Sequence, residues 1–152
     1  MPNEEQVIGL WKLISQHTLT ADGRVIPTRG EDPAGVVIYD KFGNMSVNLM
    51  RTDERASEYT DLTKYATVIE GYHGYFGTYE VDPVEPIIRH YVMGAAYRGY
   101  IGTVQVRYYE LRGDDLVLTV KEEDGSQHVL IWQRVTSKLS ADSSSPVKGK
   151  RP

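Results

Sequence analysis

The chain has 152 residues, a length that suits one domain with a hydrophobic core of its own. Its formal net charge of −4 at pH 7 argues against nucleic acid and against an anionic membrane surface as partners, because both attract basic proteins. It contains no cysteine, which excludes a disulfide framework, a thiolate nucleophile and cysteine-ligated zinc.

The first residues, Met1-Pro2-Asn3-Glu4-Glu5-Gln6, are polar and acidic, which is the reverse of a secretory leader. No apolar run along the chain approaches the length of a membrane span. These two features predict a cytoplasmic protein. Asn3 is a helix-capping residue followed by acids, so one helical turn is expected before Gly9.

Alternating patterns bounded by turn residues predict eight strands in the rest of the chain. Their expected ranges are residues 11–17, 35–39, 45–51, 75–81, 87–93, 103–111, 116–121 and 128–135. Between the third and fourth strands, apolar residues recur every three or four positions from about Thr60 to Gly74, which predicts a helix. Residues 136–152 have nothing to bury, so a disordered tail is expected after a domain of residues 1–135.

The order and spacing of these strands predict the architecture. Eight short strands in sequence, joined mostly by tight turns, remove their exposed edges most simply by closing on themselves. We therefore expect an all-β fold, an eight-stranded antiparallel up-and-down barrel with one helix between strands three and four. A two-sheet sandwich is the alternative, but it usually needs longer crossings.

The two ends of the chain are expected to meet. In a closed barrel the first and last strands are neighbours, so the end of the last strand, at Arg134, can pair with Trp11 at the start of the first. The same register pairs Leu13 with Trp132, Ser15 with Leu130 and His17 with His128. A two-residue turn at Asp124-Gly125 conflicts with this register, because it places Leu118 and Trp132 on opposite faces. A one-residue bulge near Gly125 would remove the conflict.

The segment Gly9-Leu10-Trp11, together with Arg134, resembles the lipocalin signature. Residues 40–51 (DKFGNMSVNLMR), 75–81 (YFGTYEV) and 102–111 (GTVQVRYYEL) are similar to the short lipocalin-like domain family of bacteria and fungi. The resemblance covers residues 7–135. It implies structural roles for Gly9, Trp11 and Arg134, with the guanidinium stacked on the indole, and it implies a small hydrophobic ligand. It also implies a cofactor-free isomerase or cyclase activity, since some barrels of this kind have one.

The sixth expected strand carries the first candidate for a ligand-binding group. The turn at Gly113 sets Tyr109 on the inner face, and the alternation then turns Arg107 and Gln105 inward as well. A guanidinium inside a small barrel needs a partner, so Arg107 is predicted to hold an oxygen or an anion of the ligand. A bulge in this strand would instead leave Arg107 on the surface.

Two further strands offer polar residues to the interior. His90 faces inward if Arg89 faces water, and it is a candidate for proton transfer; a buried structural histidine is an equal alternative. Tyr75 and Tyr79 share one face of the fourth strand, and Gly77 between them leaves room for a ligand or for the helix.

The third strand and the helix complete the candidate site. Either face of the third strand suits the interior, and we expect Asn48 to be the polar residue inside, with Met50 on the same face. One stripe of the helix is expected to cover a mouth of the barrel as a lid, or else to pack as core, and it consists of Tyr65, Ile69, Tyr72 and His73.

The predicted catalytic residues are His90, Arg107 and Tyr79. The predicted ligand-binding residues are Asn48, Gln105, Tyr75, Tyr109, Trp132, Met50, Tyr72 and His73. The four histidines are scattered, and no metal-ligand spacing, phosphate loop or dinucleotide motif is present, so neither a metal nor a cofactor is expected.

Three functions are compatible with these residues. The first is a cofactor-free isomerase or cyclase of a biosynthetic, secondary-metabolite pathway, in which Arg107 and Asn48 hold an oxygen of an apolar substrate and His90 or Tyr79 moves a proton. The second is a non-catalytic carrier or sensor of a small apolar ligand. The third is an interaction protein with a filled barrel. A homodimer is left open.

Overall fold

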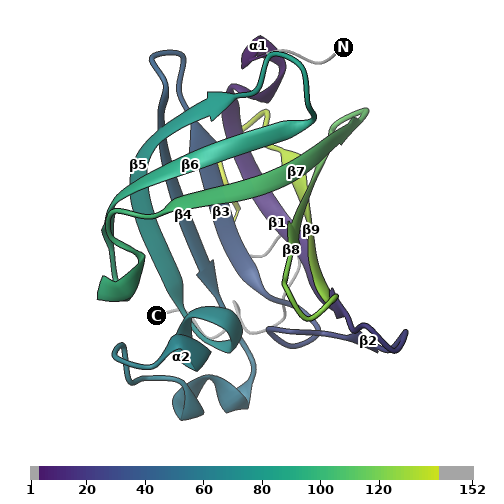
Figure 1. Cartoon of the computed structure of the whole chain (residues 1–152), viewed down its shortest axis with the longest axis vertical. Coiled ribbons are helices and arrows are strands. Elements are labelled where there is room, and N and C mark those ends of the chain that lie inside the picture. The colour runs from purple at the N-terminus through teal and green to yellow at the C-terminus, as the bar shows by residue number, and fades with distance from the viewer. Residues whose placement is uncertain (1–3, 141–152) are drawn as a thin grey trace.

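The computed structural model of the chain describes residues 4–140. From β1 onward each main strand pairs antiparallel with the next, and β9 pairs back onto β1, so eight strands close a barrel as expected (Figure 1). The short strand β2 pairs antiparallel with the end of β1 and is not one of these eight strands. The bounds of the strands are β1 Gly9–Leu19, β2 Val25–Ile26, β3 Ala34–Tyr39, β4 Asn44–Met50, β5 His73–Val81, β6 Ile87–Ala95, β7 Val104–Arg112, β8 Asp115–Lys121 and β9 Gln127–Arg134.

Short helices lie at the two ends of the barrel. The helix α1 (Glu4–Val7) lies at the end where β1 begins, and α2 (Tyr65–Glu70) lies at the opposite end with the β8–β9 turn (Figure 1). Two 3-10 helices, η1 (Glu54–Glu58) and η2 (Arg98–Tyr100), belong to the connections β4–β5 and β6–β7. No helix among residues 4–140 is long and apolar enough to cross a membrane.

The α1 end is closed by a tryptophan and an arginine. The guanidinium carbon of Arg134 lies 4.2 Å from the ring centroid of Trp11, which is fully buried. The guanidinium also donates to the carbonyl oxygens of Ile8 at 2.9 Å and Gln6 at 2.6 Å. Gly9 has φ +137°, and a Cβ atom there would lie 3.1 Å from Arg134 Nη1, so a side chain at this position would crowd the stack. These contacts close this end of the barrel.

The expected helix is shorter than its sequence pattern. In place of one helix over residues 60–73, α2 ends at Glu70, and His73 is the first residue of β5. The cap residue Gly71 donates its backbone N–H to Thr67 O and ends the helix. The prediction of a helix from the spacing of three and four residues was wrong beyond Glu70. His73 and Tyr75 both face inward, two residues apart, as alternating strand residues do, and His73 pairs with Leu49 of β4.

The predicted register of β1 against β9 holds at its start and then shifts. Trp11 pairs with Arg134 and Leu13 with Trp132, as expected. A bulge between Leu13 and Ser15 moves the later pairs by one residue, so the two pairs expected beyond it are wrong. The observed pairs are Ser15 with Ile131 and His17 with Val129.

The β8–β9 connection resolves the conflict noted in the sequence. Leu118 pairs with Leu130, so Leu118 and Trp132 both face inward. Gly125 has φ +90°, and its N–H donates to Glu122 O, which is the geometry of a turn followed by a glycine bulge. The bulge adds the residue that a two-residue turn lacks.

Two expectations at the termini fall partly outside the described residues. The helix cap at Asn3 and residues 141–152 of the expected tail lie outside residues 4–140. Residues 136–140 are exposed and belong to no helix or strand.

Candidate functional site

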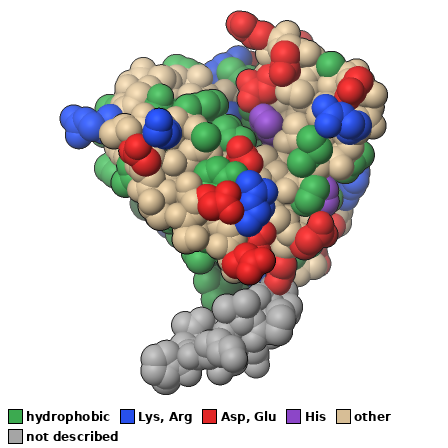
Figure 2. Space-filling model, turned by 90° about the horizontal axis from the view of Figure 1, so that it is seen from below, with side chains coloured by type: hydrophobic (Ala, Val, Ile, Leu, Met, Phe, Trp, Pro, Cys, Tyr) green, Lys and Arg blue, Asp and Glu red, His purple; other side chains and the backbone are tan. Residues whose placement is uncertain are grey.

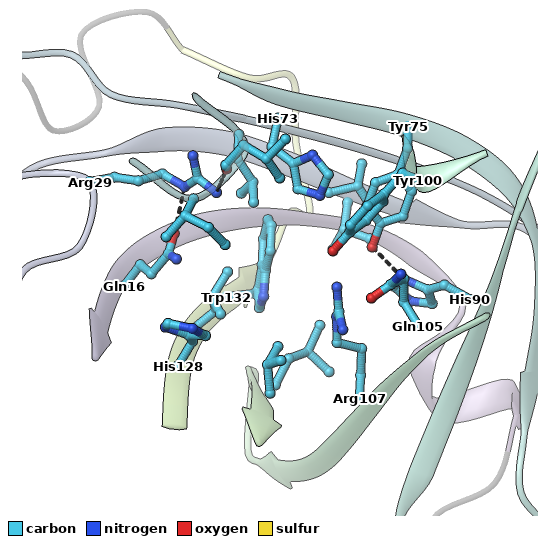
Figure 3. A pocket seen from close by; sticks show the side chains of 18 of the residues that line it. Gln16, Arg29, His73, Tyr75, His90, Tyr100, Gln105, Arg107, His128 and Trp132 are labelled. Atoms are coloured by element: carbon cyan, nitrogen blue, oxygen red, sulfur yellow. Dashed lines mark hydrogen bonds between the residues drawn. The ribbon is translucent and has the colours of Figure 1, made fainter. Parts of the chain in front are cut away.

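The half of the barrel next to α2 encloses a cavity of about 100 Å³ (Figure 3). Its apolar wall includes Val47, Leu118 and Leu130, and its lining reaches the surface at Tyr65, which is 47% exposed. Outside, acidic side chains and a histidine lie on the face seen from this end (Figure 2). The polar residues that line the cavity are Gln16, Arg29, His73, Tyr75, His90, Tyr100, Gln105, Arg107, Glu122, His128 and Trp132.

Arg107 lies inside the barrel, on the same face of β7 as Tyr109, and its side chain points into the cavity (Figure 3). It is 8% exposed, and none of the described acidic side chains forms an ion pair with it. Burial lowers the pKa of its guanidinium, but the hydroxyl groups of Tyr75 and Tyr100 raise it by more, so Arg107 stays protonated. A buried cation is therefore left without a neutralising anion.

His90 bridges two buried tyrosines. Its Nε2 lies 2.6 Å from Tyr39 Oη and its Nδ1 lies 2.7 Å from Tyr75 Oη. Burial, then Arg107 and His73, holds the pKa of His90 well below its usual value, so the ring is neutral and carries one N–H.

The hydrogen-bond partners assign the protons of this chain. Tyr39 does not line the cavity, and His90 Nε2 is the one acceptor of its hydroxyl among the described residues, so we assign the Tyr39 proton to that nitrogen. The Nδ1–H of His90 then donates to Tyr75 Oη. The hydroxyl proton of Tyr75 is thus left for an acceptor inside the cavity.

Two further cavity residues have buried polar atoms without partners. Both ring nitrogens of His73 and the indole Nε1 of Trp132 make no hydrogen bond with the described residues. The two side chains are 5% and 1% exposed, so bulk water does not compensate them. The His73 ring instead packs against Tyr100 at 4.7 Å and Tyr75 at 4.8 Å between centroids. Such unsatisfied atoms around a cavity indicate a place for a polar ligand or for water.

The buried histidines predict that the fold loses stability in mild acid. Burial, then Arg29 and Arg107, lowers the pKa of His73 to about 2, and the pKa of His90 is also well below 6.5. The unfolded chain binds these two protons below pH 6.5 while the folded chain does not, so stability is full above that pH and falls below it. Between pH 7.5 and 5.5 the expected loss is about 1.4 kcal/mol for each ring.

Urea denaturation at the two pH values measures this loss. The variant His73→Leu has one buried imidazole fewer, so it should show about half of the decrease. An unfolding free energy equal at pH 7.5 and 5.5 in both proteins would contradict the neutral, buried state of these rings.

Arg29 and the Glu122–His128 pair lie at the mouth, and the sequence did not single them out as site residues. Arg29 Nε donates to Gln16 Oε1 at 2.7 Å, and its other nitrogens donate to the carbonyl oxygens of Gly71 and Val68 at 2.7 and 2.5 Å. These bonds tie α2 to β1 over the cavity. Across the mouth, His128 Nε2 lies 2.9 Å from Glu122 Oε2 and its Nδ1 lies 2.9 Å from Thr18 Oγ1. Arg29 stands in an irregular loop, where no period shows which way a side chain points.

Three predicted ligand-binding residues point outward. In β4 the buried residues are Met45, Val47 and Leu49, so Asn48 is exposed and Met50 is 46% exposed. This corrects the expected facing of the strand, and the reason is that the more apolar of its two faces is buried. Tyr72 is exposed as well, and its hydroxyl donates to Asn48 Oδ1 at 2.8 Å on the outer surface.

The remaining predicted residues divide between the two halves of the barrel. Gln105 lines the cavity, and its Nε2 donates to Thr103 Oγ1. Tyr79 and Tyr109 face inward but are not part of the cavity lining. The Tyr79 hydroxyl donates to Asp40 O at 2.7 Å, away from the cavity, which removes the basis for its predicted proton transfer.

Gly77 allows the backbones of β5 and β6 to approach closely and does not make room for a ligand. A Cβ atom at this position would lie 1.9 Å from Tyr91 O of β6. The register of β5 against β6 shifts between Phe76 and Gly77, so the glycine lets the two backbones approach at this bulge. The expected space beside Tyr75 is therefore absent at Gly77.

A closed antiparallel barrel with a cavity at one end is an architecture that can hold one small ligand. The family model described as lipocalin-like domain matches residues 8–135, and the chain belongs to this family. No curated protein matches the chain. Within residues 4–140, no three histidine, aspartate or glutamate side chains gather as a metal site.

Two solved structures are similar to the chain. One is a de novo designed fluorescence-activating β-barrel, with 14% identity and a TM-score of 0.46, covering 89% of this chain and 100% of the designed one. The other is a redesigned β-barrel, with 12% identity and a TM-score of 0.45, covering 86% of this chain and 93% of that one.

Proposed function

We propose that this protein binds a small, largely apolar molecule in the cavity and holds an oxygen of that molecule with Arg107. The observation that carries the proposal is the buried guanidinium of Arg107, which faces the cavity and has no described carboxylate partner. A buried charge of this kind is costly unless something in the cavity compensates it. The orphan atoms of His73 and Trp132 support the same conclusion.

The finer proposal is catalysis without a cofactor, as an isomerase or cyclase of a biosynthetic pathway. Arg107 and the free hydroxyl proton of Tyr75 would together polarise a carbonyl oxygen of the substrate. Burial raises the pKa of Tyr75 to about 12, so this hydroxyl donates a hydrogen bond and does not act as a base near neutral pH. His90 acts through Tyr75 as a positioning residue, because both of its nitrogens are occupied.

The groups on the wall favour ring closure or rearrangement over proton abstraction. Burial, then the neighbouring cations, keeps the pKa of His73 at about 2, and this ring is therefore a weak base. Polarisation of a carbonyl and a shape that holds reacting atoms together need no base. A carrier would use the same contacts and release its ligand unchanged, so the product distinguishes the two.

The first experiment is a native mass spectrum of the purified protein, followed by a thermal-shift screen of hydrophobic oxygenated metabolites. Tyr75→Phe and Tyr79→Phe form a matched pair, since each loses one hydroxyl from β5 and only Tyr75 lines the cavity. Compounds should raise the melting temperature of the wild type and of Tyr79→Phe by several degrees, and that of Tyr75→Phe by less.

The results of these experiments distinguish an enzyme from a carrier and from a protein that binds no ligand. A bound compound that is converted to an isomer of equal mass supports the enzyme, and one recovered unchanged supports the carrier. If nothing co-purifies and no compound stabilises the wild type, ligand binding in this cavity is wrong and the barrel is an interaction scaffold.

A further inference from the structure

The guanidinium of Arg107 donates to Val106 O at 3.2 Å and has the hydroxyl groups of Tyr75 and Tyr100 as further hydrogen-bond partners. Figure 3 shows the Arg107 side chain pointing toward the hydroxyl groups of Tyr75 and Tyr100, with Trp132 beside it in the cavity. With the Tyr39 proton assigned to His90, the Nδ1–H of His90 donates to Tyr75 Oη and leaves the Tyr75 hydroxyl proton for another acceptor. The indole N–H of Trp132 has no acceptor among the described residues. Donors from β5, β7 and β9 therefore line one cavity, which suits an acceptor with several lone pairs.

The charges around the cavity are unbalanced. Arg107 and Arg29 are both buried in the lining, and neither forms an ion pair with a described acidic side chain. The single described carboxylate in the lining, that of Glu122, lies at the mouth and already contacts His128. These two cations are also among the causes, after burial, that lower the pKa of His73 to about 2. The interior is electropositive although the whole chain has a net charge of −4.

A neutral oxygen and a charged one differ in what they do for this site. A carbonyl group would accept hydrogen bonds from the donors but would leave the Arg107 charge uncompensated in a low-dielectric interior. An oxyanion would accept the same bonds, which are stronger when one or both partners are charged, and would also neutralise the cation. The apolar wall of Val47, Leu118 and Leu130 favours an organic anion over an inorganic one.

We propose that the ligand is a small organic anion whose charge rests on oxygen, as in a carboxylate or an enolate, and that Arg107, Tyr75 and Trp132 hold this oxygen. The proposal rests on the proposed binding function and names the chemical class of its ligand.

The test compares acids with neutral compounds of the same shape. Benzoate, cinnamate and hexanoate are each titrated beside their primary amides by calorimetry at pH 7.5 in low-chloride buffer. The enolisable diketone dimedone is titrated beside 3,3-dimethylcyclohexanone, which keeps its ring and both methyl groups, so that a carboxylate and an enolate are distinguished. Wild type should bind the better acids at least tenfold more tightly than their amides.

Four variants locate the effect. The preference for the acid should vanish in Arg107→Met and persist in Arg107→Lys, which keeps the charge. Trp132→Phe, which loses the indole N–H, should weaken acids by a few-fold and amides by less, because a hydrogen bond to a charged oxygen is the stronger one. Arg89→Met is the matched control, because Arg89 is paired with Asp82 outside the cavity and its loss should leave the preference intact.

The outcomes distinguish a failure of the oxyanion proposal from a failure of the proposed small-molecule binding. If amides and ketones bind as tightly as their acidic partners and Arg107→Met changes neither, the oxyanion is wrong while small-molecule binding stands. If no member of any pair binds, both are overturned. A preference that survives in Arg107→Met would place the anion elsewhere and would also overturn the proposal.

Discussion

Replacing Arg107 with methionine is expected to raise the free energy of unfolding of the ligand-free protein by about 1–3 kcal/mol. The wild-type guanidinium is buried beside the cavity, and no described carboxylate offsets the loss of its hydration. Methionine fills a similar volume and needs no hydrogen bonds, so it should pack against the apolar wall without this penalty. The residue would thus reduce stability while serving the ligand, as often happens at functional sites.

Urea denaturation of the ligand-free proteins measures the effect, and Arg134→Met is the matched control. Arg134 covers the Trp11 ring and donates to two carbonyl oxygens, so its loss should lower the unfolding free energy by about 1–2 kcal/mol. Two arginine-to-methionine changes in one barrel should therefore have opposite signs. A clear loss of stability in Arg107→Met would mean that Arg107 supports the fold, and its assignment to a ligand would lose its physical ground.

Replacing Trp11 with alanine is expected to lower the unfolding free energy by about 3–5 kcal/mol. Its ring is fully buried and stacked under Arg134, and its Nε1 donates to Val7 O at 2.9 Å. The substitution removes the largest side chain at the closed end, leaves a void, and takes away the surface that orders the guanidinium. A loss of this size is a large part of the stability of a typical domain.

Thermal and urea denaturation test this result against Phe42→Ala. Phe42 is also aromatic but is 80% exposed in the β3–β4 hairpin, so its loss should change the unfolding free energy by less than about 0.5 kcal/mol. A Trp11→Ala variant as stable as Phe42→Ala would mean that the closed end does not depend on the stack of Trp11 and Arg134.

The architecture was predictable because its signal is local and repeated. Period-two runs separated by turn residues marked the eight strands, and closure followed from the need to cover their edges. Trp11 opposite Arg134 fixed how the first and last strands meet. The pattern failed at the helix, where His73 lies three residues after Glu70 and could continue either period.

The candidate site was predictable on some strands and not on others. Arg107 was placed inside because the hairpin sets Tyr109 against Leu118, and the alternation follows from that pair. His90 was placed inside because Arg89, its neighbour, belongs in water.

Asn48 and Met50 of β4 were assigned to the wrong side because a polar side chain was expected to face the ligand. The opposite face of the strand is the more apolar one, and it is buried. Tyr79 faces inward as expected, but only the position of Asp40 O shows that its hydroxyl is already used.

The sequence by itself determined a closed barrel, its plug of Trp11 under Arg134, and an arginine on the inner face of β7. Each of these depends on contacts between neighbouring residues or paired strands, which a periodic pattern records. Tertiary structure alone decided which half of the barrel contains the cavity. It alone decided that Arg29 lines this cavity and donates to the carbonyl oxygens of Val68 and Gly71 at the end of α2. It also decided that His90 lies between the hydroxyl groups of Tyr39 and Tyr75. These features depend on how side chains distant in sequence fill a volume and share hydrogen-bond partners, and no local spacing encodes them.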